Sequence, residues 1–216
     1  MAFTDFHGSQ EASRKGRQAI ANEKPDFVLV AGDIVNHDGE RAKRFLLDLA
    51  EAGSLVYFVP GNMDGFDLIT WPGTENVRGL HARCETWKNV SLIGLGGSPR
   101  GAFTTPIEYS EEAGAEVLEK ALINYHGGNM ILLSHCPPKG TKVDEVVFGQ
   151  HIGSSSVRKF VEKSKPAIVV SGHVHEAQGV DRIGLTVIVN PGPAKSGNCA
   201  IINLNEKVDV TLAKFM

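Results

Sequence analysis

Five short clusters of possible metal ligands lie between residues 5 and 175, and each comes directly after a short apolar run. The clusters are Asp5-Phe6-His7, Gly32-Asp33, Gly61-Asn62-Met63-Asp64, Ser134-His135 and Gly172-His173-Val174-His175. Carboxylate, amide and imidazole groups are the oxygen and nitrogen donors that bind Mn, Fe, Zn and Ni in proteins. The pattern therefore indicates a metal centre built from distant parts of the chain.

The apolar runs before the clusters have the length and the β-branched content of buried strands. They cover residues 1–4, 27–31, 55–59, 130–133 and 167–170. Ligands of α/β proteins bind at the carboxyl ends of the strands, so these polar side chains are expected to converge at one edge of the protein.

In type and order, the five clusters resemble the signature of the calcineurin-like metallophosphoesterases, in particular its small single-domain members. That signature reads D-x-H, G-D, G-N-H-[DE], a later His, and G-H-x-H. The resemblance extends from Asp5 to His175, and the later Asn190-Pro191-Gly192-Pro193 also suits the family. This chain departs from the pattern at Met63, where most members have His.

The resemblance implies two divalent metal ions, most typically Mn, with Fe, Zn or Ni as alternatives. The first ion is expected to be bound by Asp5, His7 and His175. The second is expected to be bound by Asn62, His135 and His173, and Asp33 is expected to bind both ions. A carboxylate can bridge two cations ~3.5–4 Å apart, and a water bound there can supply hydroxide near neutral pH. The expected catalytic residues are Asp33, Asn62, Asp64 and His135.

The leaving group of a phosphate ester is helped by a proton donor, and Met63 cannot be that donor. The role would fall to another group, to water, or to a substrate that needs no such help. For Asp64 we expect a contact that orients a metal-binding histidine rather than a role as the acid.

Residues 136–153 form the only long segment without a periodic pattern, and they follow His135 directly. Long loops in compact domains are often functional, so we expect this loop to form part of the substrate wall. The helix that should begin at Ser154 could offer backbone amides to an anion. The candidate substrate contacts are His151, Ser154, Arg100 and Lys142, with plain surface exposure as the alternative for each.

The other histidines and the cysteines suggest no second site. His37, His81 and His126 are interpreted as structural or surface residues. The three cysteines are odd in number and widely spaced, without a C-x-x-C pair, which favours a reducing compartment. Cys136 follows a ligand but is interpreted as a small buried thiol.

The chain has 216 residues, of which 42% are hydrophobic and 22% charged, which predicts one domain over residues 1–216. A net charge of −3 gives no general attraction to nucleic acid or to an anionic membrane. Because Asp5 leaves no room upstream for a signal peptide and no apolar run approaches ~20 residues, we expect a cytoplasmic protein. The oligomeric state stays open, with a homodimer as one possibility.

Periodicity predicts helices over residues 10–22, 39–52, 111–125 and 154–163, and a hairpin around Trp87-Lys88-Asn89. The last forty residues read as antiparallel strands 179–183, 185–190, 200–204 and 208–213. If the strand-helix half forms one sheet and the hairpins with the tail form the other, the fold is α/β: a four-layer α/β/β/α sandwich of two mixed sheets flanked by helices. Residues 1–4 are short for a central strand, so either that strand is short or the natural chain begins upstream.

The function predicted is hydrolysis of a small phosphate diester or monoester. A nuclease of the same fold is one alternative, but it would need basic and aromatic residues around its site, and aromatics are only 7% of the chain. A non-catalytic, protein-binding scaffold with a residual metal site is the other, and Met63 points mildly toward it.

Overall fold

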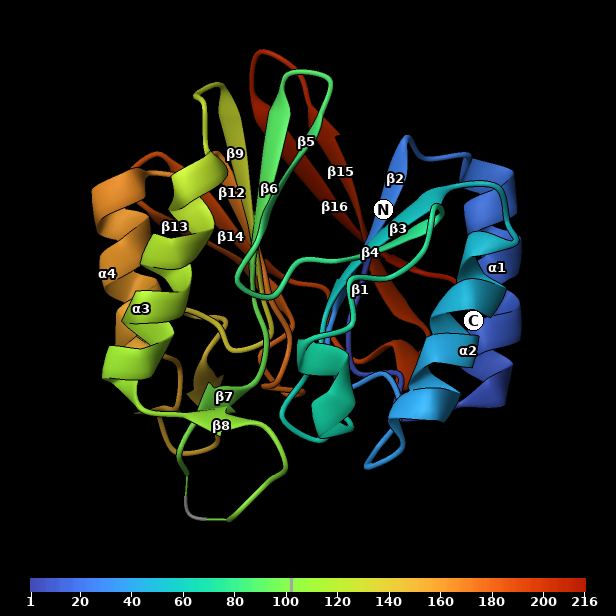
Figure 1. The fold of residues 1–216 in the computed structure, drawn as a ribbon, viewed down its shortest axis with the longest axis horizontal. Coiled ribbons are helices and arrows are strands. Elements are labelled where there is room, and N and C mark those ends of the chain that lie inside the picture. The colour runs from blue at the N-terminus through green and yellow to red at the C-terminus, as the bar shows by residue number, and fades with distance from the viewer. Residues whose placement is uncertain (102) are drawn as a thin grey trace.

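The computed structural model describes residues 1–101 and 103–216. Two six-stranded mixed sheets face each other, and a pair of helices covers the outer side of each (Figure 1). The expected four-layer α/β/β/α sandwich is therefore confirmed. None of the helices in the part of the chain described is both long and apolar enough to cross a membrane.

The first sheet has the strand order β16-β15-β1-β2-β3-β4. Its strands in chain order are β1 (Ala2–Phe3), β2 (Phe27–Ala31), β3 (Leu55–Val59), β4 (Val77–Gly79), β15 (Asn198–Leu204) and β16 (Val208–Lys214). Strands β1 to β4 are parallel, and β15 pairs antiparallel with β1. Helices α1 (Gln10–Glu23) and α2 (Gly39–Ala50) lie along its outer face (Figure 1).

The second sheet has the order β13-β14-β12-β9-β6-β5. Its strands are β5 (Cys84–Trp87), β6 (Val90–Leu95), β9 (Asn129–Ser134), β12 (Ile168–Val170), β13 (Gly179–Ile183) and β14 (Thr186–Asn190). The four inner strands are parallel and the two edge strands antiparallel. Helices α3 (Glu111–Ala121) and α4 (Ser155–Ser164) cover this sheet (Figure 1).

Smaller elements connect the main strands. They are the pairs β7 (Ser98–Pro99) with β8 (Glu108–Tyr109) and β10 (Glu145–Val146) with β11 (Gln150–His151), and the 3₁₀ helices η1 (Phe66–Ile69), η2 (Leu122–Asn124) and η3 (Ala194–Ser196). Within residues 1–101 and 103–216, each α-helix is preceded by a residue whose side chain accepts a backbone N–H bond, which satisfies one of the free amides of the first turn.

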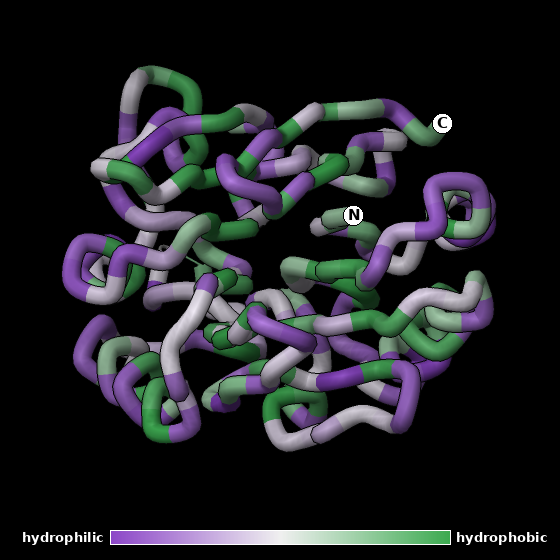
Figure 2. Tube along the Cα trace, turned by 90° about the horizontal axis from the view of Figure 1, so that it is seen from above, coloured by the Kyte–Doolittle hydropathy of each residue, from purple (hydrophilic) through white to green (hydrophobic). Residues whose placement is uncertain are grey.

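The apolar core has three parts. Buried side chains such as Leu29, Tyr57, Leu92 and Val170 fill the space between the sheets. Two further clusters fill the space between each sheet and its helices. Figure 2 shows the most hydrophobic segments in the central strands, with hydrophilic segments concentrated in the outer helices and loops.

The predicted division of the strands between the sheets was wrong for the last hairpin. Hairpin β13–β14 joins the second sheet, but hairpin β15–β16 extends the first sheet, where Ala200 pairs with Ala2. The chain crosses between the sheets through residues 190–197, where the Ala194 N–H donates to the Thr4 carbonyl at 2.8 Å. The two-residue β1 is thereby paired on both sides, which explains how so short a strand can lie inside a sheet.

Candidate metal centre

All five ligand clusters lie just beyond the carboxyl ends of parallel strands. Strands β1, β2 and β3 of the first sheet and β9 and β12 of the second lead into them. The residues brought together from the first sheet are Asp5, His7, Asp33 and Asn62, and those from the second are His135, His173 and His175. The site is therefore built where the ends of the two sheets meet.

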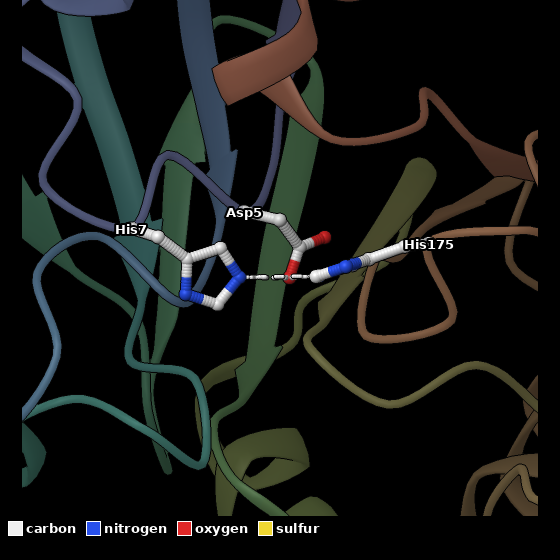
Figure 3. Close-up of side chains that lie close together, drawn as sticks. All are labelled: Asp5, His7 and His175. Atoms are coloured by element: carbon white, nitrogen blue, oxygen red, sulfur yellow. Dashed lines mark hydrogen bonds and ion pairs between the residues drawn. The ribbon is translucent and has the colours of Figure 1, made fainter.

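Asp5, His7 and His175 form the first group of possible ligands (Figure 3). The Nε2 atoms of the two histidines are 3.1 Å apart, and Asp5 Oδ1 is 3.4 Å from His175 Nε2. Asp5 Oδ1 is buried and has no hydrogen-bond partner among the described residues. A buried carboxylate oxygen is rarely left without a partner, and a cation among these three atoms would supply one. The residues therefore fit a metal ion.

The second group is centred on the Asn62 side chain. Asn62 Oδ1 lies 2.9 Å from His135 Nε2 and 3.0 Å from His173 Nδ1. His135 Nδ1 lies 2.7 Å from the Ala31 carbonyl and donates its proton there, so Nε2 is the ring nitrogen that faces Asn62 and is placed to bind a metal. Ring nitrogens and an amide oxygen that converge in this way also suit a divalent ion.

Asp33 lies between the two groups. One of its oxygens, Oδ2, is 3.8 Å from His7 Nε2, and the other, Oδ1, is 3.6 Å from His135 Nε2. The Met63 backbone N–H also donates to Oδ1, at 2.9 Å. This placement offers one carboxylate oxygen to each group.

The electrostatics of the site favour cation binding. Burial, with the charge of His135, lowers the pKa of His173 to about 3, so its ring is neutral and can bind a metal. Burial raises the pKa of Asp5, but His175 and His135 outweigh it and hold the pKa below its ordinary value. Burial also lowers the pKa of His135, whereas Asp33 and Asp5 raise it more strongly, to above its ordinary value. The carboxylates that attract this proton would equally attract a metal ion.

Several ligand residues have a backbone conformation that is uncommon for side chains with a Cβ. Left-handed φ angles of 55°, 47°, 51° and 68° occur at Asp5, His7, Asp33 and His173. Glycine precedes two of them because the strand ends approach closely: a Cβ on Gly32 would lie 2.5 Å from His135 Nδ1, and one on Gly172 would overlap the Thr4 side chain. The glycines of the G-D and G-H clusters are thus required by packing.

Asp64 was expected to contact a metal-binding histidine, but its hydrogen bonds go to backbone N–H groups instead. Its Oδ1 accepts the N–H groups of Ile34 at 2.8 Å and Val35 at 2.9 Å, and its Oδ2 accepts that of Gly61 at 2.7 Å. Burial and the charge of Asp33 raise its pKa to about 7, while these three donors act in the opposite direction. The carboxylate joins the loop after β2 to the loop after β3, both of which carry ligands.

One supporting residue was not predicted. Asn36 Oδ1 lies 2.8 Å from His7 Nδ1 and accepts its proton, so that His7 Nε2 faces the metal site as a lone pair. The only signal in the sequence is a polar amide shortly after Asp33, which is too common in loops to be read as a partner of His7.

A cavity of about 800 Å³ opens beside the second group, with Asn62 and His173 in its wall. Two of the predicted substrate contacts, Arg100 and His151, line it, whereas Lys142 and Ser154 do not. Lys142 is exposed, and its backbone N–H donates to Asp181 at 2.8 Å. Lys142 is therefore not placed to contact a substrate in this cavity.

The predicted anion site at the start of α4 is already occupied by a carboxylate of the chain. The N–H groups of Ser155 and Ser156 each donate to Glu111 at 2.8 Å, and the Ser154 hydroxyl donates to it at the same distance. Ser154 is also fully buried, so it is not placed to contact a substrate in this cavity. A helix N-terminus does bind an anion here, but the anion is the side chain that opens α3.

The loop 136–153 is organised around a buried carboxylate, that of Asp144. It accepts the N–H groups of Gly140, Thr141 and Gly153, and the ring of His151 lies 2.9 Å from it. The side chain of His151 is 37% exposed, so it is both anchored and accessible from the cavity.

The remaining histidines and Cys136 have the structural or surface roles expected of them. His81 Nδ1 accepts the Gly96 N–H at 3.0 Å, and burial lowers its pKa to about 4. His37 and His126 are exposed. Cys136 is fully buried, and burial raises the pKa of its thiol far above its ordinary value.

Comparison with known proteins agrees with the signature in the sequence. The family model of the calcineurin-like phosphoesterases matches residues 1–177. The chain is 34% identical over 201 residues to the uncharacterized protein MJ1162 of Methanocaldococcus jannaschii, with 89% of this chain and 87% of that protein covered.

Solved structures share the fold over the whole chain. The protein TT1561 of Thermus thermophilus superposes with a TM-score of 0.74 at 17% identity, covering 100% of this chain and 97% of that one. A dimetal phosphatase from Danio rerio superposes with a TM-score of 0.64 at 11% identity, covering 100% and 95%. The family match and the fold lead to one conclusion: the chain belongs to the calcineurin-like phosphoesterases, a family of metal-dependent enzymes.

Proposed function

We propose that this protein hydrolyses a small phosphate diester or monoester with the help of two divalent metal ions. The observation that carries the proposal is the position of Asp33, whose two oxygens face His7 Nε2 at 3.8 Å and His135 Nε2 at 3.6 Å. A carboxylate directed at two separate groups of ligands is suited to bridge a pair of cations.

The proposed ligands divide between the two ions as the groups do. Those of the first are Asp5, His7 and His175, those of the second are Asn62, His135 and His173, and Asp33 serves both. When bound, the ions supply a hydroxide near neutral pH and positive charge for the phosphate. Manganese is the proposed occupant, since oxygen and imidazole donors suit it, although this ligand set also accepts Fe, Zn and Ni.

The protein residues have three tasks in this reaction. Asp33 offsets the charge between the cations, and the neutral Asn62 amide leaves net positive charge for the phosphate. Asp64 and Asn36 hold the ligand loops and the His7 ring in position. Met63 offers no proton, so substrates with good leaving groups are favoured.

A small ester is proposed rather than a nucleic acid. The cavity of about 800 Å³ beside Asn62 falls within the range that holds a small molecule. The net charge of −3 provides no general attraction for a polyanion.

The proposal is tested by metal analysis together with hydrolysis of bis-p-nitrophenyl phosphate. Wild-type protein loaded with Mn should hold two equivalents and hydrolyse the ester. Asp33→Asn should lose at least one equivalent and most of the activity while remaining folded, because the amide cannot offer a charged oxygen to each ion. Asp48→Asn, a change at an exposed position on α2, is the matched control and should behave as wild type.

Two equivalents retained with full activity in Asp33→Asn would overturn the assignment of the bridge. Bound metal without turnover of any ester would favour the scaffold alternative. Digestion of single-stranded DNA with faster turnover than small diesters would favour a nuclease.

A further inference from the structure

Exposed apolar side chains form part of the lining of the cavity beside Asn62 and His173. Phe103 and Ile152 line it and are 84% and 42% exposed, although large apolar side chains are normally buried. The tip of hairpin β10–β11 also exposes Val147 and Phe148, at 63% and 97%, but these two side chains do not line the cavity. Exposed apolar groups that gather around a cavity mark a binding surface more often than isolated ones do.

The wall of the cavity combines apolar and charged side chains. Tyr109 and Val146 add apolar surface, and Arg100 and Lys139 bring positive charge. The carboxylates of Glu108 and Glu111 also line the cavity, but Glu108 accepts hydrogen bonds from Thr105, and Glu111 accepts those from the start of α4. The segment around β7 and β8 provides one side, and the loop 136–153 provides the other. A ligand seated here would meet cations and an apolar surface together.

The cavity joins the metal centre on one side. Asn62 and His173 of the second ligand group are in its wall, but Asp5, His7 and His175 of the first group are not. A phosphate held between the two groups would therefore direct an organic substituent past the second group and into the cavity. The cavity volume of about 800 Å³ is far larger than a phosphate group needs.

We infer that the substrate is a phosphate ester whose organic group is large and has an apolar, aryl or alkyl, face that packs against Phe103, Tyr109 and Ile152. The inference rests on the proposed function, since it places the phosphate at the metal centre. Arg100 and Lys139 lie in the same wall and complement the negative charge of the ester.

Non-hydrolysable phosphonates separate the contribution of the organic group from the chemistry. Methylphosphonate, phenylphosphonate and naphthylphosphonate carry the same anion and one substituent of increasing apolar area. Their dissociation constants are measured by calorimetry with the full chain loaded with Mn. We expect phenylphosphonate to bind at least about tenfold more tightly than methylphosphonate, and naphthylphosphonate more tightly again, because each ring leaves water for an apolar wall.

Substitutions in the cavity wall test whether the preference for large apolar groups arises there. In Ile152→Ser and Phe103→Ser, the ratio between naphthyl and methyl affinity should fall several-fold. Leu185→Ser is the matched control, because Leu185 is 94% exposed in the turn between β13 and β14 and does not line the cavity. The affinity ratio in this variant should equal that of wild type.

The outcomes distinguish this inference from the proposed function. Equal affinity for the three phosphonates, in a protein that hydrolyses bis-p-nitrophenyl phosphate, overturns the inference and leaves the proposed function standing. A naphthyl preference that survives in both cavity variants also overturns it. If methylphosphonate does not bind the metal-loaded protein and no ester is hydrolysed, the proposed function fails and the inference fails with it.

Discussion

Replacement of Asp64 by asparagine tests whether this residue supports the metal centre by holding two loops together. The carboxylate is fully buried and accepts three backbone N–H groups, from Ile34 and Val35 on one oxygen and from Gly61 on the other. Asparagine has nearly the same shape but only one acceptor oxygen. The variant can keep the bonds on one side of the group, and on the other side an amide N–H must face an NH₂ group.

The expected cost follows from these contacts. A hydrogen bond to a charged acceptor contributes about 1.5–3 kcal/mol, and a buried donor left without a partner costs about 1–3 kcal/mol. Asp64→Asn should therefore lower the free energy of unfolding by about 2–5 kcal/mol. For a chain of this size, that is a fall in Tm on the order of 5–15 °C. Asp64→Ala removes all three acceptor contacts and should cost at least as much.

The measurement is thermal unfolding by circular dichroism in the presence of a chelator at mildly alkaline pH. Removing metal matters because bound ions would stabilise the folded state and mask the difference. Asp48→Asn, on the exposed side of α2, again serves as the matched control and should leave Tm unchanged. If Asp64 instead acted by orienting a metal-binding histidine, the metal-free Tm would stay at the wild-type value and only metal affinity would fall. That result would refute our reasoning.

Two further predictions concern Met63 and His81. Met63→His should restore a proton donor beside the leaving group, so that kcat/KM for a series of aryl and alkyl esters depends less steeply on leaving-group pKa than in wild type; an unchanged slope would show that position 63 is not near the leaving oxygen. Burial lowers the pKa of His81 from 6.5 to about 4, so the unfolded chain binds this proton more readily than the folded protein does. The contribution of neutral, buried His81 to the free energy of unfolding is therefore fully present above about pH 6.5 and should be lost as the pH falls toward about 4. At 1.36 kcal/mol per pKa unit, the loss in the free energy of unfolding reaches about 3 kcal/mol. Urea unfolding measured between about pH 7.5 and about pH 4 should therefore show a smaller pH dependence in His81→Gln than in wild type. An equal pH dependence in both proteins would contradict the assignment.

The sequence was sufficient to predict the layers of the fold but not the partners of its strands. Helices and hairpins follow from local periodicity, and the predicted ranges agree closely with α1, α2 and α4. The pairing of β15 with β1 joins residues at opposite ends of the chain, Ala200 and Ala2. Alternation of apolar and polar residues shows that a strand has a buried face, but it does not show which of two similar sheets that face will join.

A similar limit applies to the site. Residues at the carboxyl ends of parallel strands converge for topological reasons, and the structure brings the seven expected ligands together. The failures concern partners that only tertiary contact reveals. Glu111 accepts the backbone N–H bonds at the start of α4, although it lies 45 positions before Ser156 in the sequence. The Asp64 carboxylate accepts bonds from backbone N–H groups, which every residue type except proline carries, so the sequence does not reveal these partners.

The departure at Met63 leaves the ligand geometry intact. Its backbone N–H donates to Asp33 Oδ1 at 2.9 Å, and its carbonyl accepts the His37 N–H at 2.7 Å. Both bonds use the main chain, so a methionine makes them as well as a histidine would. The loop that positions the bridging carboxylate therefore does not depend on the side chain at this position. For this reason the loss of histidine argues for a different choice of substrate, one whose leaving group departs without a proton, and gives little support to the loss of the metal site.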